Sequence, residues 1–581
     1  LSLWRISVQV PGGWAITSIE FPIVPGIRRK DRMLLYAPSG WGVSYPLEPG
    51  LNFEGPYPSW ASGVQMMAVQ DAEMQKGLYV AAHDPEGALK TLICRATADS
   101  ACCSISHPLS LVPHPDGIYT IPWPAAIGFY RGDYFEAAQI YRGFSYTTRW
   151  GVPEQPSWMD RVPAWFREID LWLRPDGAAE DNLDITLKAL EYFDVPTALH
   201  WYRWHQIVYD TMYPDYLPPK DGFKEAIATF QKAGARVTCY INGRLCDPAS
   251  NLWQEKNAAS CAARKDNGDC YTEIYGSHVP NNAMCPFTEL WQNTIAGIVQ
   301  TLTGEYGLDG VYIDQISAAA GVPCHNEEHG HPPGGGTFWR EGYCRLLDAC
   351  RNQLAEGKIL TTEENAECWI NQIEGHLTVN TPVAGCRPIP LFPAIYSDRT
   401  LCIATLYYAK DEPQCALPFR YKNAWAFLWG AQLGWIQPKR IMHPDAEKQA
   451  LYLKQLAKVR KCARPCITGG RFLGMRRVTG ENPRNQLTAS APFGGTYPID
   501  EDAVMASLWQ SSGGRLALLI TNVNEECCAI LLDNPASSAN IEVYDHTGRL
   551  ETLTAGPRIN LKIEGLQSLV LLFGTASNIS G

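Results

Sequence analysis

The chain has 581 residues, of which 46% are hydrophobic and 19% charged, and its formal net charge is −11. This length exceeds what one hydrophobic core supports, so several domains are expected. The acidic balance argues against nucleic acid and anionic membrane surfaces as partners, and no apolar stretch approaches the roughly 18 residues that a membrane helix needs. Whether the chain forms a homo-oligomer is left open.

The nineteen cysteines are an odd number, and they show no spacing typical of small disulfide-rich domains. This usage favours a reducing compartment such as the cytoplasm. The first residue is Leu1 rather than Met, so a signal peptide could precede it and export stays open.

Residues 1–155 are predicted to form a β-sandwich. Short alternating or apolar runs recur from Trp4–Val10 to Ile118–Trp123, each closed by Gly, Pro or Asp. A predicted helix at 132–144 and a Pro-containing linker at 152–156 end this domain. Residues 466–581 return to the same pattern, from Ala503–Trp509 to Ser568–Phe573, and are predicted to form a second β-sandwich.

Between these domains, residues 156–465 alternate strands with helices, the pattern of parallel βαβ units. About 300 residues of this kind is what a (β/α)8 TIM barrel with long loops needs. A doubly wound open sheet is the alternative, but no Gly-x-Gly-x-x-Gly turn follows the first strand. The predicted strands are Ala164–Leu173, Pro196–Trp204, Ala235–Ile241, Leu308–Ile313, Lys358–Thr362, Pro393–Tyr396 and Leu433–Gln437; the predicted helices are Leu183–Phe193, Phe223–Ala233, Leu290–Tyr306, Phe338–Glu356 and Ala446–Val459.

Carboxylates follow two successive predicted strands. Asp314 ends the apolar run Leu308–Ile313, and Glu363 ends the next strand, Lys358–Thr362. Because active sites of TIM barrels lie at the carboxyl ends of the strands, these two acids should face one pocket. Two facing carboxylates are what glycosidic cleavage requires, one ionised and one protonated. Asp314 is the expected nucleophile, and Glu363 the expected acid/base.

Two further acids, Glu364 and Glu367, compete with Glu363 for the acid/base role. Side chains alternate along a strand, so only one of Glu363 and Glu364 can point into the barrel. The sequence favours Glu363 and leaves the choice open.

Polar side chains at other strand ends are predicted to bind the substrate. The second strand carries an aromatic-rich stretch in which Tyr202 is expected to pack inside the barrel. Asp398 could hold substrate hydroxyls or cap a helix. The predicted substrate-binding residues here are Trp204, His205, Gln206, Asn242, Arg244, Gln315 and Asp398.

The loop after Asp314 holds Cys324, His325, His329 and His331 in a surround of Gly and Pro. Three histidines and a cysteine could bind zinc, but their spacing matches no established zinc motif. The prediction is that His329 and His331 line the substrate pocket and that the protein binds no metal and needs no cofactor. A metal-dependent lyase or aldolase is the alternative that these histidines keep open.

Several stretches together resemble a largely uncharacterised bacterial family of glycoside-hydrolase-like TIM barrels. They are Gly132–Arg142, His200–Gln206, Tyr240–Arg244, Gly310–Ile316, His329–Gly336 and Thr362–Glu367. More distantly the layout is similar to endo-α-N-acetylgalactosaminidases and the α-amylase/α-galactosidase superfamily. The resemblance implies a retaining α-glycosidase acting on a carbohydrate, with Asp314 as nucleophile and Glu363 as acid/base. At Glu364 this chain departs from the family pattern, in which glycine is usual.

The expected function is therefore retaining α-glycoside hydrolysis, as in polysaccharide degradation. An inverting hydrolase, with a wider gap between the carboxylates, is one alternative. A carbohydrate-binding barrel without catalysis is another, although both carboxylates are present.

Overall fold

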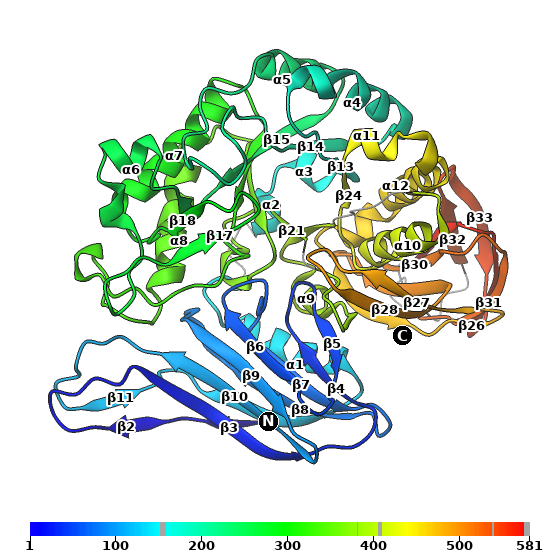
Figure 1. Cartoon of the computed structure of the whole chain (residues 1–581). Coiled ribbons are helices and arrows are strands. Elements are labelled where there is room, and N and C mark those ends of the chain that lie inside the picture. Colours follow the sequence, from blue (N-terminus) through cyan, green and yellow to red (C-terminus); the bar gives the residue numbers. More distant parts are fainter. Residues whose placement is uncertain (152–157, 380, 405–409, 537–539, 575–581) are drawn as a thin grey trace.

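A computed structural model of the chain describes residues 1–151, 158–379, 381–404, 410–536 and 540–574. Sheet-rich regions at the two ends of the chain flank a central set of strands and helices (Figure 1). Within these ranges, no helix is long and apolar enough to cross a membrane.

The N-terminal region contains sheets of seven, four and two strands. Apolar side chains from the two larger sheets, such as Leu35, Val80, Leu92 and Ile105, share one buried core. A short strand from the central region, β22, completes the seven-stranded sheet by pairing with β5. The strands are β1 (Ser2–Trp4), β2 (Ser7–Gln9), β3 (Ser18–Arg28), β4 (Met33–Ala37), β5 (Val43–Pro46), β6 (Asn52–Tyr57), β7 (Met66–Asp71), β8 (Lys76–Ala82), β9 (Lys90–Ala96), β10 (Ser100–Pro108), β11 (Ile118–Thr120), β12 (Ala125–Arg131) and β22 (Arg387–Pro388).

The central region is a nearly closed barrel of eight parallel strands, which confirms the predicted TIM-barrel fold. The strand order is β23-β21-β20-β19-β15-β14-β13-β24, and a parallel bridge between Ile403 and Gln432 brings the two ends of the sheet together. The strands are β13 (Leu171–Leu173), β14 (Thr197–Trp201), β15 (Arg236–Asn242), β19 (Gly310–Asp314), β20 (Ile359–Glu363), β21 (Gly375–Thr378), β23 (Leu401–Ala404) and β24 (Leu433–Ile436). A small sheet of β16 (Leu245–Cys246), β17 (Thr272–Ile274) and β18 (Pro280–Ala283) follows the third strand.

The sixth and seventh barrel strands differ from the prediction. The run Pro393–Tyr396, predicted as a strand, lies in the helix α9, and the actual strands are β21 and β23. A short apolar run does not distinguish a buried helix from a strand, and Pro393 lies in the first turn, where no intrahelical N–H bond is lost. The first predicted strand was also too long, because Ala164–Arg167 is a helical turn.

Helices surround the barrel, and their apolar faces explain their positions. In α5, for example, Phe223, Ala226, Ile227 and Phe230 recur at helical spacing and are all buried. The helices are α1 (Tyr134–Ser145), α2 (Trp158–Arg161), α3 (Ala164–Arg167), α4 (Ala179–Phe193), α5 (Phe223–Lys232), α6 (Asn251–Glu255), α7 (Glu289–Gly304), α8 (Phe338–Arg351), α9 (Leu391–Tyr396), α10 (Pro413–Leu428), α11 (Pro438–Ile441) and α12 (Glu447–Ile467).

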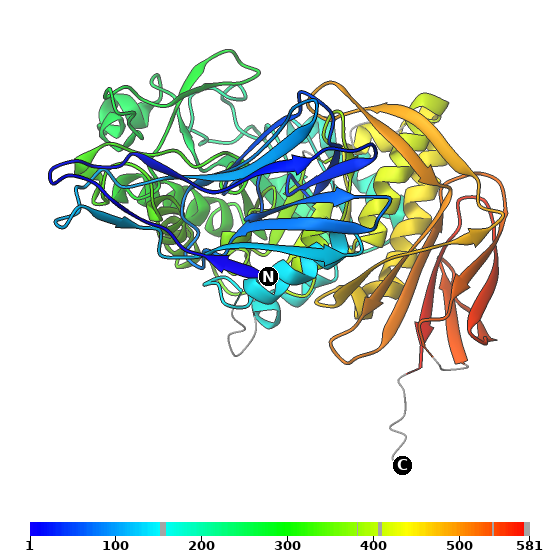
Figure 2. The same ribbon diagram turned by 90° about the horizontal axis from the view of Figure 1, so that it is seen from below.

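The C-terminal region has a six-stranded sheet, a three-stranded sheet and the hairpin β27–β28. Seen from below, these strands lie beside the yellow helices α10 and α12 of the barrel (Figure 2). Their core includes Val504, Leu518, Ile530 and Leu571. The strands are β25 (Arg471–Arg476), β26 (Thr479–Gly480), β27 (Arg484–Ser490), β28 (Thr496–Asp502), β29 (Val504–Gln510), β30 (Leu516–Asn522), β31 (Cys528–Asp533), β32 (Asn540–Asp545), β33 (Gly548–Thr554), β34 (Arg558–Ile563) and β35 (Ser568–Phe573).

Candidate active site

Two carboxylates meet at the carboxyl ends of neighbouring barrel strands. Asp314 is the last residue of β19 and Glu363 the last of β20, and these strands pair in parallel. Each of the two carboxyl groups affects the pKa of the other. Both line an open cavity of about 370 Å³, within the size range of small-molecule sites. The cavity is lined by Arg174, Asp176, Tyr202, Arg203, Tyr209, Asp314, Glu363, Val379, Trp435, Gln437 and Phe493.

Buried hydrogen-bond donors surround the Asp314 carboxylate. The hydroxyl of Tyr240 donates to Oδ2 at 3.0 Å, and the hydroxyl of Tyr312 donates to Oδ1 at 3.4 Å. The amide nitrogen of Asn242 lies 3.5 Å from Oδ2. Asn242 and Asp314 are cross-strand partners, as are Tyr240 and Tyr312 two residues earlier, so all four side chains share one face of the sheet. The donors stabilise the ionised form of Asp314.

The environment separates the roles of the two acids. Burial raises the pKa of Asp314, but the hydrogen bonds from Glu363, Tyr240 and Tyr312 oppose that rise. Burial raises the pKa of Glu363 well above its usual value, and the negative charge of Asp314 raises it further. Of the two acids, Glu363 is therefore the more readily protonated and Asp314 the more readily ionised.

Backbone conformation at the barrel mouth is unusual. Gln315 and Glu364, which directly follow the two carboxylates, have φ angles of 67° and 60°, and the cavity residues Arg203 and Trp435 have φ angles of 50° and 70°. Residues other than glycine rarely adopt this region, and such strain clusters at functional sites. The φ angle at Glu364 is one that glycine adopts without a steric penalty.

The walls of the cavity offer both polar groups and rings. Asp176 follows the first barrel strand, pairs with the guanidinium of Arg203 and accepts a hydrogen bond from Gln437 at 2.8 Å. The guanidinium of Arg174 lies over the Trp435 ring, 4.6 Å from its centroid. Such a mixture suits a ligand with several hydroxyl groups and apolar C–H faces.

One wall residue comes from the C-terminal region. Phe493 lies between β27 and β28, and its side chain is 69% exposed while lining the cavity. The cavity is therefore completed by a residue far from the barrel in sequence.

The competing acids Glu364 and Glu367 do not line this cavity. The backbone N–H of Glu364 donates to Leu377 at 2.8 Å, and its fully buried side chain reaches towards Gly40 of the N-terminal region. This position agrees with the alternation expected from Glu363.

Glu367 lies deeper, between the N-terminal region and the barrel. Its carboxylate accepts hydrogen bonds from Tyr57 at 3.0 Å, Gln65 at 3.0 Å, Tyr141 at 2.7 Å and Tyr396 at 2.6 Å. Four donors satisfy the buried carboxylate at this junction, so we assign Glu367 a structural role between the N-terminal region and the barrel.

The residues predicted to bind substrate are not among the side chains that line this cavity. Trp204 is fully buried, and its indole N–H donates to the carbonyl of Tyr240 at 2.8 Å. His205 is also buried and bonds to the carbonyl of Ile207 at 2.8 Å, whereas Gln206 is exposed and donates to Pro219 at 3.2 Å. The strand exits into an aromatic cluster here, so the chain turns these side chains away from the cavity.

Two predicted charged residues are bound in ion pairs. Arg244 is buried and pairs with Glu273 at 2.7 Å. Asp398 follows α9 and pairs with Arg142 of α1 at 2.5 Å, so it joins the barrel to the N-terminal region. Neither lines the cavity.

Asn242 and Gln315 lie beside Asp314 without lining the cavity. The side-chain oxygen of Asn242 accepts the backbone N–H groups of Arg244 and Leu245, both at 2.8 Å, which orients its amide towards Asp314. Gln315 directly follows Asp314 and is buried.

His329 and His331 also lie away from the cavity, and they converge on Cys285 and Cys324. The ring of His331 contacts Phe287, which precedes α7, and stacks on Phe338, the first residue of α8.

Several residues that line the cavity were not predicted from the sequence. Tyr202 was expected to be packed within the barrel, yet it is half-buried and part of the cavity wall. Arg174 and Asp176 follow the first strand, Trp435 lies in the last and Gln437 directly follows it, so the strand-end rule could have found them. Nothing in the sequence indicated Phe493.

One further acid near the carboxylates was also missed. Asp210 accepts a hydrogen bond from the hydroxyl of Tyr213 at 3.3 Å. Burial, and then the charge of Asp314, raise the pKa of Asp210 to about 6.

Known proteins resemble the chain over most of its length. A family model described as a domain of unknown function, DUF6259, matches residues 119–408. A Bacteroides thetaiotaomicron protein whose name assigns it to the glycoside hydrolases is 35% identical over 539 residues, which are 91% of this chain and 77% of the relative. The chain belongs to this glycoside hydrolase family. This glycoside hydrolase is also 32% identical over 448 residues to a Monosiga brevicollis protein named in the same way, covering 70% of the chain and 37% of that longer relative.

Solved structures share the fold of this glycoside hydrolase at low sequence identity. The α-N-acetylgalactosaminidase NagBb from Bifidobacterium bifidum superposes with a TM-score of 0.62 at 15% identity, covering 87% of this chain and 82% of that one. The GH36 α-galactosidase AgaA from Geobacillus stearothermophilus gives a TM-score of 0.55 at 11% identity, covering 96% of this chain and 76% of that one.

Proposed function

We propose that the protein cleaves an α-glycosidic bond with retention of configuration at the anomeric carbon. The supporting observation is that the carboxyl groups of Asp314 and Glu363, at the ends of two paired parallel strands, line one cavity. In retaining enzymes the two carboxyl groups lie about 5–5.5 Å apart, whereas inverting enzymes hold them about 6.5–9.5 Å apart to admit a water molecule. Neighbouring strands lie about 4.7–4.9 Å apart, so acids at the ends of two paired strands match the narrower, retaining gap.

In this mechanism the Asp314 carboxylate attacks the anomeric carbon while the glycosidic C–O bond breaks. Glu363 transfers its proton to the departing oxygen. Water then attacks the covalent glycosyl ester, Glu363 takes the proton from that water, and Asp314 is released as the carboxylate. The hydroxyls of Tyr240 and Tyr312 hold the resting charge of Asp314 before the attack.

The substrate is proposed to be a carbohydrate with an α-linked terminal or internal sugar. The α configuration rests on the solved neighbours, which are named as an α-N-acetylgalactosaminidase and an α-galactosidase. Trp435 and Phe493 offer rings for the C–H face of a sugar, and Asp176 and Gln437 offer groups for its hydroxyls.

The domain arrangement belongs to the same proposal. We infer that the regions 1–155 and 466–581 are β-sandwiches around a catalytic barrel at 156–465. The shared apolar cores of their facing sheets support this arrangement.

The test is a panel of aryl α- and β-glycosides of galactose, N-acetylgalactosamine and glucose, assayed with wild type, Asp314→Asn, Glu363→Gln and Glu364→Gln. We expect Asp314→Asn to abolish hydrolysis. Glu363→Gln should still release dinitrophenol, which needs no acid, and azide should rescue turnover by forming a glycosyl azide of retained configuration. Glu364→Gln is the matched control and should keep its activity.

The first-formed anomer, followed by NMR during hydrolysis, decides the stereochemistry. An α-anomer formed first supports retention. A β-anomer formed first, or undiminished activity of folded Asp314→Asn, would contradict the proposal.

A further inference from the structure

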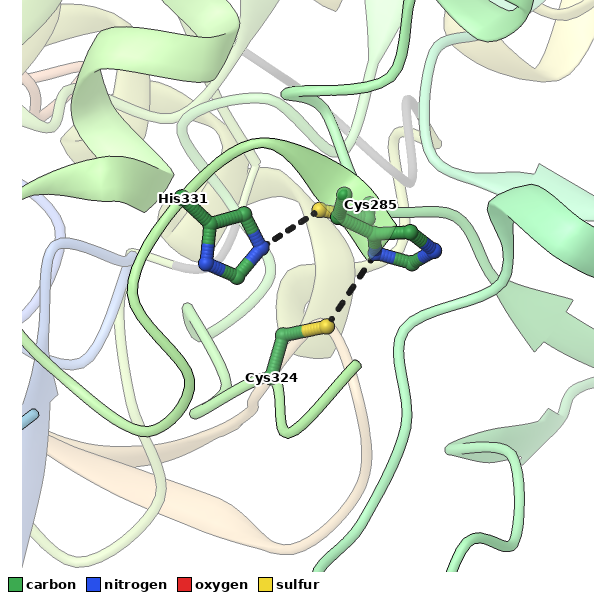
Figure 3. A group of neighbouring side chains, drawn as sticks. Cys285, Cys324 and His331 are labelled. Carbon is green, nitrogen blue, oxygen red and sulfur yellow. Dashed lines mark hydrogen bonds between the residues drawn. The ribbon is translucent and has the colours of Figure 1, made fainter. Parts of the chain in front are cut away.

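Four buried side chains of zinc-binding type converge beside the barrel, outside the candidate active site. They are Cys285, Cys324, His329 and His331, and their sulfur and nitrogen atoms all lie within 4.8 Å of one another. Figure 3 shows the sulfur atoms of Cys285 and Cys324 and the ring of His331 directed at one point. Cys285 precedes α7 in the segment after the third barrel strand, and the other three follow the fourth strand.

Backbone carbonyls fix which nitrogen of each imidazole faces this point. The Nδ1 of His331 lies 2.8 Å from the carbonyl oxygen of Pro332, which only accepts, so this outer nitrogen carries the hydrogen. The Nε2 of His329 lies 2.7 Å from the carbonyl oxygen of Ser260 and 3.0 Å from the amide nitrogen of Asn326, and the nearer carbonyl favours the hydrogen on this Nε2. The lone pairs of His329 Nδ1 and His331 Nε2 therefore face inwards, as in metal sites whose ligands are oriented by a second layer of hydrogen bonds.

The spacing of the inward atoms fits a tetrahedral ion. The Sγ of Cys285 lies 3.4 Å from His331 Nε2, and the Sγ of Cys324 lies 3.4 Å from His329 Nδ1. Around zinc, bonds of about 2.3 Å to sulfur and about 2.0–2.1 Å to nitrogen place tetrahedral sulfur and nitrogen ligands about 3.6 Å apart. Both observed sulfur–nitrogen distances are within a few tenths of an ångström of this expected separation.

We propose that Cys285, Cys324, His329 and His331 form a structural zinc site. Four protein ligands leave no open position, which is the pattern of structural rather than catalytic zinc. The loop after Asp314 does not reveal this zinc site by its sequence alone, because the fourth ligand, Cys285, lies in a different loop.

The proposed ion would join three parts of the fold. Its ligands connect the loops after the third and fourth barrel strands, and the fourth strand ends in Asp314. Gly334, three residues beyond His331, bridges to both Cys324 and Ser110 of the N-terminal region. Fixing this loop would hold the N-terminal region against the mouth of the barrel.

The experiment measures the metal itself and does not depend on glycosidase activity. The full chain is expressed in zinc-supplemented medium, dialysed, and analysed by plasma mass spectrometry. We expect one zinc ion per chain in wild type and its loss in Cys324→Ser and His331→Ala. Cobalt added to the reduced apoprotein should give a thiolate-to-cobalt charge-transfer band and tetrahedral visible bands.

Cys350→Ser is the matched control, because Cys350 is a fully buried cysteine of α8 outside the cluster. It should keep its zinc. Cobalt binding should weaken in the ligand variants by more than about a hundredfold, beyond the range for losing an outer hydrogen bond. Chelation should lower the thermal midpoint of wild type and Cys350→Ser alike.

Wild type alone can overturn the proposal even if the ligand variants fail to fold. Wild-type protein without zinc, whose reduced form gives no thiolate–cobalt band, would refute it. A Cys285–Cys324 disulfide found by mass spectrometry under native redox conditions would also refute it.

Discussion

Replacing Tyr240 by Phe tests whether the hydroxyls around Asp314 keep that carboxylate ionised. Tyr240 is fully buried, and its hydroxyl donates to Asp314 Oδ2 at 3.0 Å. A hydrogen bond to a charged group contributes about 1.5–3 kcal/mol. At about 1.36 kcal/mol per pKa unit, losing it raises the pKa of Asp314 by about one to two units.

The sign of the effect follows from the proposed mechanism. Attack needs the carboxylate, so activity falls as the pH drops through the pKa that governs Asp314. Removing a donor destabilises the carboxylate and moves this acid limb of the profile to higher pH by about one to two units. The alkaline limb, at which Glu363 loses its proton, should move less. The two acids are coupled, so each limb reports the pair rather than one residue.

The assay is kcat/KM against pH for the best aryl glycoside, compared among wild type, Tyr240→Phe and Tyr216→Phe. Tyr216 belongs to the same aromatic cluster, but its hydroxyl accepts the backbone N–H of Asn242 at 2.7 Å and does not contact Asp314. The acid limb of the Tyr216→Phe profile should therefore lie at the same pH as that of wild type. An unmoved limb in Tyr240→Phe, or an equal shift in Tyr216→Phe, would refute the reasoning.

Two further predictions concern stability and substrate binding. Asp170 is fully buried and pairs with Arg460 at 2.9 Å, so Asp170→Asn leaves a buried guanidinium without its counter-charge. It should cost about 3–5 kcal/mol, measured as a lower denaturation midpoint with an unchanged pH profile, and an unchanged midpoint would contradict this. Phe493→Ala removes the exposed ring at the cavity and should raise KM about fivefold, equivalent to about 1 kcal/mol, with little change in kcat. An unchanged KM would exclude Phe493 from the binding surface.

The sequence by itself determined the barrel and the location of its two strand-end acids. Strands buried on both faces must be apolar throughout, so Leu308–Ile313 and Lys358–Thr362 were visible as strands, and the polar residues after them marked the mouth. Alternation along the strand meant that only one of Glu363 and Glu364 could point inwards, and the choice between them stayed open with Glu363 ahead. The prediction of a strand at Pro393–Tyr396 was wrong, because a short apolar segment fits a buried helix as well as a strand.

Only the tertiary structure decided which other side chains meet. Glu367 receives donors from three segments distant in sequence, and Phe493 reaches the cavity from the C-terminal region. Cys285 joins the histidine loop from a different loop, 39 residues before Cys324 in the sequence. These encounters depend on how loops and domains pack, which no local periodicity records, whereas strands and their ends follow from burial alone.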